Sequence, residues 1–191
     1  MTSPVIDLID RLYTTWGHDN YSESVSQIAH GEQSAALAIE SGSSEGLVLA
    51  ALLHDIGHLL VLDSTNGSPQ LDSDDNHEST GARFLATHFG IEVTAPIALH
   101  VAAKRYLCYS DAQYFATLSP ASVASLRLQG GPMRGDEAAR FERSPHFAHA
   151  VRLRRWDEDA KVAGLLTPSF HSYLSMMERN LVDKQSRRAS V

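Results

Sequence analysis

Apolar side chains recur every three to four residues along most of the chain, which is the spacing of one face of an α-helix. The first such stripe starts at Val5 and predicts a helix that ends near Gly17. A second stripe predicts a helix that runs from Glu23 to the stop signal Ser41-Gly42. Because no stretch alternates apolar and polar residues as a half-buried strand would, the pattern favours an all-α fold.

The third predicted helix is apolar on almost every side. It contains the sequence LVLAALLHDIGHLL and begins after a capping serine at position 43 or 44. A helix with apolar side chains all round is typical of the interior of a domain. We therefore expect one central, buried helix that runs through both His54 and His58, followed by a polar loop over residues 63–75.

The remaining helical patterns fill the rest of the chain. They lie at about His77–His88, Val93–Ala103, Ser110–Thr117, Pro120–Leu128, Asp136–Glu142, Pro145–Trp156 and Ser169–Leu181. No repeat and no linker divides them. The sequence therefore predicts a single-domain helical bundle over residues 1–191, with boundaries accurate to a few residues.

Composition narrows the class of protein. The chain has 191 residues, a hydrophobic share of 43% and a net charge of −7, which is typical of a folded domain and argues against a basic surface for nucleic acid. The single Cys108 suits a reducing compartment. The N-terminal sequence lacks the pattern of a signal peptide, and no apolar run approaches the roughly 20 residues of a membrane span. We expect a cytoplasmic monomer or small homo-oligomer without nucleic-acid or membrane partners.

Histidine supplies the candidate chemistry, because the chain has 10 histidines. His54 and Asp55 are adjacent within an apolar helix, and His58 follows one turn later. Burying three ionisable groups without partners is costly, so a metal ion or an anion is expected beside them. Neighbours on a helix point about 100° apart, yet a bridging Asp55 carboxylate would let His54 and Asp55 serve a dinuclear centre. We interpret five other histidines as ordinary residues: His18, His88, His146, His149 and His171.

Four further candidates follow one another along the chain: His30, His77, His100 and Asp157. Together with the His54-Asp55 pair, the pattern H…HD…H…H…D resembles the HD-domain superfamily of metal-dependent helical enzymes. The two histidines between the pair and the last aspartate are typical of its dinuclear members. The chain is most similar to the phosphonate-cleaving oxygenases of the PhnZ type, relatives of myo-inositol oxygenase, over a metal-binding core of about residues 20–161.

The resemblance implies a cofactor of two iron ions in the mixed-valent Fe(II)/Fe(III) state, with O₂ as cosubstrate. One iron would be held by His30, His54, Asp55 and Asp157. The other would be held by Asp55, His77 and His100, with Asp55 as the bridge. Imidazole and carboxylate ligands with open positions suit redox-active iron.

An oxyanion site is expected next to these ligands. His58, Lys104 and Arg154 each lie three or four residues from a candidate ligand, so on helices they face the same cavity. Ser122 and Ser125 share one helix face and could add hydroxyl donors. Such a set suits a tetrahedral oxyanion, and the resemblance implies that it binds the phosphonate. The alternatives are solvated surface cations and serines that merely cap or fill a helix.

The resemblance also implies where the other end of the substrate lies. Glu23 precedes His30 by two helical turns, at the position of an acid that meets the substrate amine. The alternative is that Glu23 is an acid in the first turn of a helix, stabilised there by the helix dipole. Where the resembled enzymes commonly have a tyrosine, this chain has Asn20, with Tyr21 beside it. The lost ring predicts a larger pocket that takes a trimethylammonium group. The rings available for cation–π contact are Tyr13, Trp16 and Tyr21.

The function that the resemblance implies is O₂-dependent cleavage of the C–P bond of a small organophosphonate. The substrate would be 1-hydroxy-2-aminoethylphosphonate or its trimethylammonium relative, and the products phosphate and glycine or glycine betaine. Three alternatives stay open. A metal-dependent phosphohydrolase would use the same ligands, a non-catalytic HD module would sense a ligand or assemble a complex, and inositol-type ring cleavage would need a neutral pocket.

Overall fold

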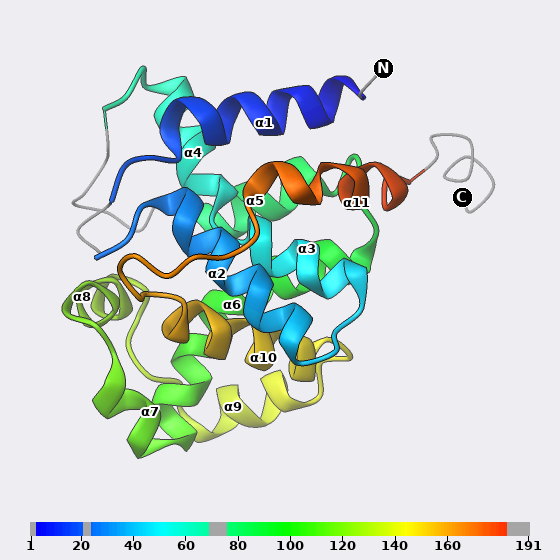
Figure 1. Cartoon of the computed structure of the whole chain (residues 1–191). Coiled ribbons are helices and arrows are strands. Elements are labelled where there is room, and N and C mark those ends of the chain that lie inside the picture. The colour runs from blue at the N-terminus through cyan, green and yellow to red at the C-terminus, as the bar shows by residue number, and fades with distance from the viewer. Residues whose placement is uncertain (1–2, 21–23, 69–75, 183–191) are drawn as a thin grey trace.

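The computed structural model describes residues 3–20, 24–68 and 76–182, and these ranges contain helices and no strand (Figure 1). The all-α prediction is confirmed. The helices are α1 (Pro4–Trp16), α2 (Gln27–Glu40), α3 (Glu45–Leu53), α4 (Ile56–Ser64), α5 (His77–Leu85), α6 (Ile91–Ser110), α7 (Ala112–Thr117), α8 (Pro120–Leu128), α9 (Gly135–Glu142), α10 (Phe147–Asp159), the 3₁₀-helix η1 (Phe170–Tyr173) and α11 (Leu174–Arg179).

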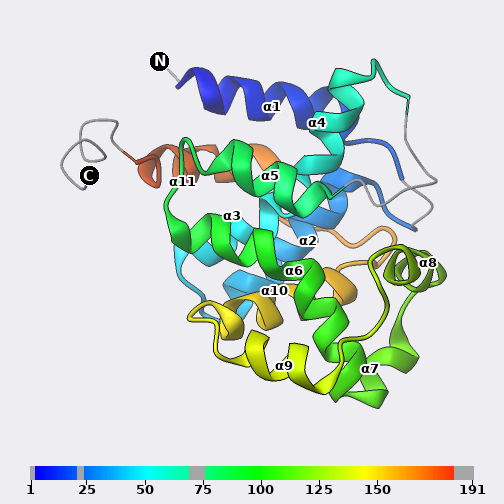
Figure 2. The same cartoon turned by 180° about the vertical axis from the view of Figure 1, so that it is seen from behind.

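The bundle is organised around four helices that pack on one another in its middle: α2, α3, α6 and α10. Both views place α1 and α4 at one end of the molecule, α7 and α9 at the opposite end, and α8 at one side (Figures 1 and 2). The main apolar core takes side chains from α1, α2, α3, α4, α5, α6, α10, η1 and α11. A smaller core, built on Ala103, Met133, Ala138, Phe141 and Ala150, fixes α9 against α6 and α10.

Helix α3 is the buried centre that its apolar sequence predicts, since every residue from Gly46 to Leu53 is buried. The prediction of one unbroken helix is wrong, however. The helix ends at Leu53, and α4 starts at Ile56 with its axis bent by 42°. Asp55 has φ −97° and ψ 8°, a sparsely populated backbone region that often holds active-site residues. At this bend the Asp55 carboxylate lies beside the His54 ring, with Oδ2 3.5 Å from Nε2.

Helix α2 begins at Gln27 and not at Glu23 as its apolar stripe predicts. The physical reason lies in the first N–H groups of the helix, which need partners outside it. Gln27 N donates to Asp19 O at 3.0 Å and Ile28 N to Gly17 O at 2.8 Å. Ser26 is the N-cap, and its hydroxyl accepts from the backbone N–H of residue 29. These bonds tie the start of α2 to the end of α1.

Two glycines let helices cross closely beside the candidate ligands. A Cβ at Gly31 would lie 2.6 Å from Leu52 O, where α2 crosses α3. A Cβ at Gly57 would lie 2.0 Å from His77 O, where α4 meets α5. Both contacts are with backbone, which cannot move aside cheaply, so each crossing requires a residue without a side chain.

Within the described ranges, no single helix combines the length and the apolar composition that a membrane crossing needs. Helices α3 and α4 reach that length only as a bent pair. Most of the other predicted helices are confirmed with shifted ends. The final predicted helix is divided into η1 and α11. Helix α10 continues past Trp156, which places Asp157 in its last turn.

Candidate metal centre

The six residues that the sequence marks as metal ligands meet at one point of the fold. They come from α2, the junction of α3 and α4, α5, α6 and α10: His30, His54, Asp55, His77, His100 and Asp157. All are buried except Asp55, whose side chain is 19% exposed. Segments separated by more than a hundred residues of sequence therefore contribute to a single cluster.

Asp55 stands between two pairs of histidines. Its Oδ2 atom lies 3.8 Å from Nε2 of His30 and 3.5 Å from Nε2 of His54. Its Oδ1 atom lies 3.6 Å from Nε2 of His77 and 3.8 Å from Nε2 of His100. Each carboxylate oxygen thus faces its own pair, which is the arrangement a carboxylate needs to bridge two cations.

The imidazole rings are oriented by backbone carbonyls. Nδ1 of His30 lies 2.9 Å from Ala160 O, Nδ1 of His54 lies 2.8 Å from Ala51 O, and Nδ1 of His100 lies 2.7 Å from the carbonyl of residue 97. Because a carbonyl can only accept, each Nδ1 carries the hydrogen and each Nε2 is directed at Asp55. Metal-binding histidines usually donate their other ring N–H to an acceptor in this way, which fixes the tautomer and the orientation of the ring.

The donor atoms fit metal ions. Nε2 of His30 lies 3.2 Å from Nε2 of His54, and Nε2 of His77 lies 3.1 Å from Nε2 of His100. Two nitrogen lone pairs at such distances repel each other unless a proton or a cation lies between them. Among the described residues, two groups have donor atoms close enough together to share one ion: His30 with His54 and Asp55, and Asp55 with His58 and His77. Imidazole and carboxylate donors are those that iron and similar transition metals bind.

The protonation states suit the same role. Burial lowers the pKa of His54 and lowers that of His100 strongly, so these rings are neutral, as a ligand must be. Burial alone would raise the pKa of Asp55 and Asp157. The neighbouring imidazoles reverse this at Asp55, and the Arg154 guanidinium does so at Asp157, so both pKa values are lower than usual. The cluster therefore offers two anionic carboxylates and, at His54 and His100, neutral imidazoles. At His30 burial opposes protonation, but the hydrogen bond to Asp157 and the charges of Asp157 and Asp55 raise the pKa.

Four of the predicted oxyanion-binding residues form a second cluster beside Asp157. Nζ of Lys104 donates to the Ser125 hydroxyl at 2.9 Å, and Nη2 of Arg154 donates to the Ser122 hydroxyl at 3.4 Å. Lys104 and Arg154 are only 3% and 4% exposed, which excludes the interpretation of both as solvated surface cations. Burial, followed by the nearby Arg154 charge, lowers the pKa of Lys104 to about 8.

His58 lies at the cluster of candidate ligands, with its ring next to Asp55 and His77. It follows the break between α3 and α4. The His58 ring stacks on His77, with centroids 4.0 Å apart and an angle of 19° between the planes. The structure thus groups His58 with Asp55 and His77.

Several residues that contact this cluster escaped the sequence analysis, among them Tyr114, Glu158 and Lys161, whose Nζ donates to the Ser122 hydroxyl at 2.9 Å. Nε of Arg154 donates to the Tyr114 hydroxyl at 2.6 Å, and its other nitrogens contact Asp157 and Glu158. Glu158 also accepts from the Ser122 hydroxyl at 3.1 Å. The separation of four residues between Arg154 and Glu158 could have revealed that pair. No spacing rule points to Tyr114, which comes from α7.

The residues predicted at the amine end of the substrate are described only in part. Asn20 is exposed in the connection between α1 and α2. Tyr21 and Glu23 lie outside the described residues. The expectation that Tyr13 could face a cationic substrate is wrong, because it is 2% exposed, stacks on Phe170 at 4.3 Å and donates to a backbone carbonyl of α3.

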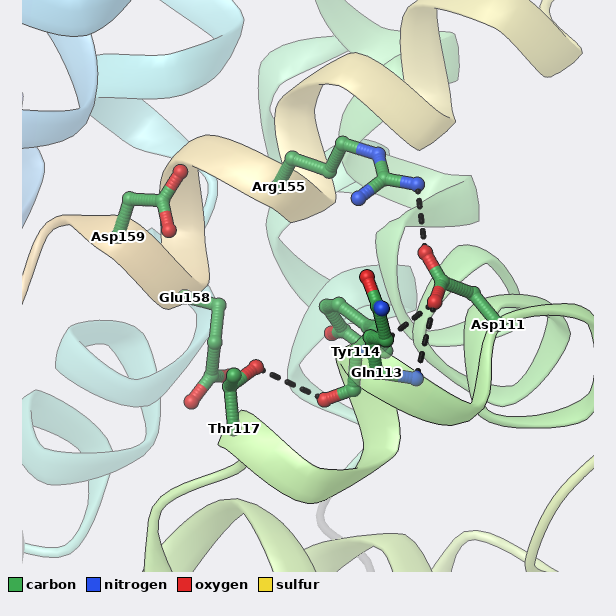
Figure 3. A pocket seen from close by; sticks show the side chains of 7 residues that line it. All are labelled: Asp111, Gln113, Tyr114, Thr117, Arg155, Glu158 and Asp159. Carbon is green, nitrogen blue, oxygen red and sulfur yellow. Dashed lines mark hydrogen bonds and ion pairs between the residues drawn. The ribbon is translucent and has the colours of Figure 1, made fainter.

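A pocket of about 220 Å³ lies between α7 and α10, and none of the candidate metal ligands lines it (Figure 3). Its lining residues are Asp111, Gln113, Tyr114, Thr117, Arg155, Glu158 and Asp159. Tyr114 and Glu158 both line this pocket and contact Arg154. The side chains of Tyr114 and Glu158 therefore form the wall between this pocket and Arg154.

Comparison with known proteins agrees with this site. Residues 27–107 match the HD domain family, a span that includes every candidate ligand except Asp157. A hydroxymethylphosphonate dioxygenase of Gimesia maris is 48% identical over 162 residues, which cover 85% of this chain and 81% of the relative. A [1-hydroxy-2-(trimethylamino)ethyl]phosphonate dioxygenase (glycine-betaine-forming) of Leisingera caerulea is 38% identical over 183 residues, 94% and 91% of the two chains.

An uncharacterised protein of Acanthamoeba polyphaga mimivirus is 32% identical over 174 residues, 90% of this chain and 80% of the relative. The fold and the cluster of histidines and aspartates define a metal-dependent helical enzyme. At these identities and coverages, the chain belongs to the HD-domain oxygenases of the PhnZ type, the family of the phosphonate dioxygenases, and it is an enzyme that uses a metal and O₂.

Proposed function

We propose that this oxygenase uses two iron ions and O₂ to cleave the C–P bond of a 1-hydroxyphosphonate. The observation that carries the proposal is the position of Asp55, whose two carboxylate oxygens face two separate pairs of histidines. A single ion would need only one of these pairs. A carboxylate between two pairs favours a dinuclear centre.

The ligands divide unequally between the two ions. His30, His54, Asp55 and Asp157 would hold one iron, and Asp55, His77 and His100 would hold the other. A bound mixed-valent pair supplies the activation of O₂ and the redox chemistry at the substrate carbon. The second ion has fewer protein ligands, which leaves more positions for the substrate hydroxyl and phosphonate.

The side chains of the protein bind and orient the phosphonate group. Lys104 and Arg154 supply buried positive charge, and the hydroxyls of Ser125 and Ser122 accept hydrogen bonds from them, so all four groups lie where the phosphonate would bind. His58 would contact the substrate from the side of His77. Charge-assisted hydrogen bonds of this kind are strong where water is excluded, so the site suits a tetrahedral dianion.

Two substrates are candidates. The relative from Leisingera caerulea favours 1-hydroxy-2-(trimethylamino)ethylphosphonate, which would yield phosphate and glycine betaine; a primary amine in its place would yield glycine. Asn20, Tyr21 and Glu23 would then meet the cationic end. The relative from Gimesia maris has the higher identity, 48% against 38%, and favours hydroxymethylphosphonate, which has no cationic end and would yield phosphate and formate. We expect either reaction to take place in the cytoplasm, in a monomer or small homo-oligomer.

The direct test is release of inorganic phosphate from a panel of 1-hydroxyphosphonates, with and without O₂, by protein of measured iron content. The panel contains hydroxymethylphosphonate and the amino and trimethylamino compounds. We expect phosphate only in the presence of O₂. Release at the same rate without O₂ would show a metal-dependent phosphohydrolase instead.

The Glu23→Ala variant separates the two candidate substrates. If the enzyme binds a cationic substrate through Glu23, the variant should raise the KM for the amino compounds and leave that for hydroxymethylphosphonate unchanged. Steady-state kinetics on the same panel measure both values. Unchanged kinetics on every amino compound would remove Glu23 from the site.

A further inference from the structure

We propose that Tyr114 is a positioning residue, whose hydroxyl fixes the plane of the Arg154 guanidinium for binding the substrate phosphonate. The inference rests on the proposed function for the role of Arg154. It adds a residue of α7, a helix that contributes none of the candidate ligands. The geometry of Arg154 and the attachment of α7 to α10 carry it.

Arg154 is held from several sides within a buried environment. A guanidinium has five N–H donors in one plane, so its orientation is fixed when donors on different edges are bonded. Nη1 contacts Asp157, and Nη2 contacts Glu158 and the Ser122 hydroxyl. Nε donates to the Tyr114 hydroxyl at 2.6 Å. The bond to Tyr114 is thus the one that fixes the Nε edge of the guanidinium.

Tyr114 is itself fixed in relation to α10. It is 6% exposed, and its backbone N–H donates at 3.1 Å to the carboxylate of Asp111, the N-cap of α7. The other oxygen of Asp111 accepts from Arg155 at 3.1 Å, so α7 is tied to α10 at consecutive residues of the latter (Figure 3). The Tyr114 hydroxyl consequently has little freedom to move away from Arg154.

Removing the hydroxyl leaves a buried Nε–H without its partner, and an unsatisfied donor of a charged group is costly. Arg154 would stay paired with Asp157 but tilt about that contact, and its remaining donors would lose their alignment with the substrate. The contact of Arg154 with Asp157 does not involve Tyr114. We therefore expect Tyr114 to affect binding of the phosphonate and not binding of iron.

The test compares Tyr114→Phe with the control Tyr106→Phe, which also removes one hydroxyl. The Tyr106 hydroxyl donates to Glu142 at 2.8 Å in an exposed position, away from the site. In iron-loaded protein we expect Tyr114→Phe to weaken binding of inorganic phosphate, measured by calorimetry, about tenfold, as one lost charge-assisted hydrogen bond implies. The KM for the phosphonate substrate should rise similarly, with kcat within about twofold and the iron content unchanged. The control should match the wild type.

Two results would overturn the inference. The first is phosphate affinity and KM in Tyr114→Phe equal to those of Tyr106→Phe. The second is a loss of iron with KM unchanged, because Tyr114 would then act on Asp157. These results differ from a failure of the proposed function. If the wild type oxidises none of the phosphonates, the proposed function is rejected. A difference in phosphate binding between the two variants would still support the role of Tyr114.

Discussion

Among single residues, Asp55 decides how many ions the cluster can hold. Its oxygens are the atoms that face both histidine pairs, and the rings of His30, His54 and His100 are turned toward it by carbonyls of the backbone. The surrounding histidines keep Asp55 ionised although it is largely buried. A bridging role depends on that charge.

Asp55→Ala should therefore abolish binding of the dinuclear centre. We expect iron, measured by mass spectrometry on purified protein after anaerobic loading, to fall from two ions per chain to one or fewer. Asp111→Ala is a suitable control, because this carboxylate lies in the α7 connection and is not a candidate ligand. Retention of two ions in Asp55→Ala would contradict the assignment of Asp55 as the bridge.

We expect the titration of Lys104 to determine how substrate binding depends on pH. Burial lowers its pKa to about 8, so it is charged below that pH and neutral above it. The phosphonate loses a cationic partner as pH rises, and kcat/KM should fall by up to about tenfold per pH unit above 8. In Lys104→Arg the charge persists, because a guanidinium does not titrate in this range, and the fall should move to higher pH. Identical profiles for the two proteins would rule out Lys104 as the titrating group.

The sequence was sufficient to name the candidate ligands, because their order along the chain resembles a known family and their buried setting needs partners. It was not sufficient to name the residues that contact and orient Arg154. Tyr114 reaches Arg154 from a helix that begins 42 residues before it, and no local spacing encodes such a contact. Glu158 is only four residues from Arg154, yet its charge was not connected with the oxyanion cluster.

Among the elements, the break between α3 and α4 is the feature that periodicity misses. The sequence from Leu47 to Leu60 is apolar enough to continue as one helix, and nothing local requires a stop. The stop arises from tertiary structure, because Gly57 packs against the backbone of His77 and Asp55 must face four histidines. The start of α2 at Gln27 is likewise decided by bonds to the α1–α2 connection.

Gly57→Ala tests the closeness of α4 and α5. The added methyl would lie 2.0 Å from His77 O, so the helices must separate. We expect a loss of stability of about 1–3 kcal/mol in urea unfolding and a loss of iron, since His77 moves away from Asp55. In the control Gly135→Ala, the methyl meets only the end of the Tyr109 side chain at 3.4 Å, so stability and iron content should stay near wild type. A stable, fully loaded Gly57→Ala protein would contradict this packing.

For the whole molecule, the central claim is that one bundle brings ligands from residues 30 to 157 around two metal ions. The helical class followed from the apolar periodicity, and the family membership follows from relatives that cover most of the chain. The arrangement in space does not follow from either, because it depends on how α2, α5, α6 and α10 pack around the α3–α4 junction. The number of ions is the property that this packing determines.

The most direct measurement is a crystal structure of the iron-loaded protein with anomalous diffraction at the iron edge. Our account predicts two anomalous peaks on opposite sides of the Asp55 carboxylate. One peak would lie among His30, His54 and Asp157, and the other beside His77 and His100. A single peak, or two peaks away from Asp55, would contradict it.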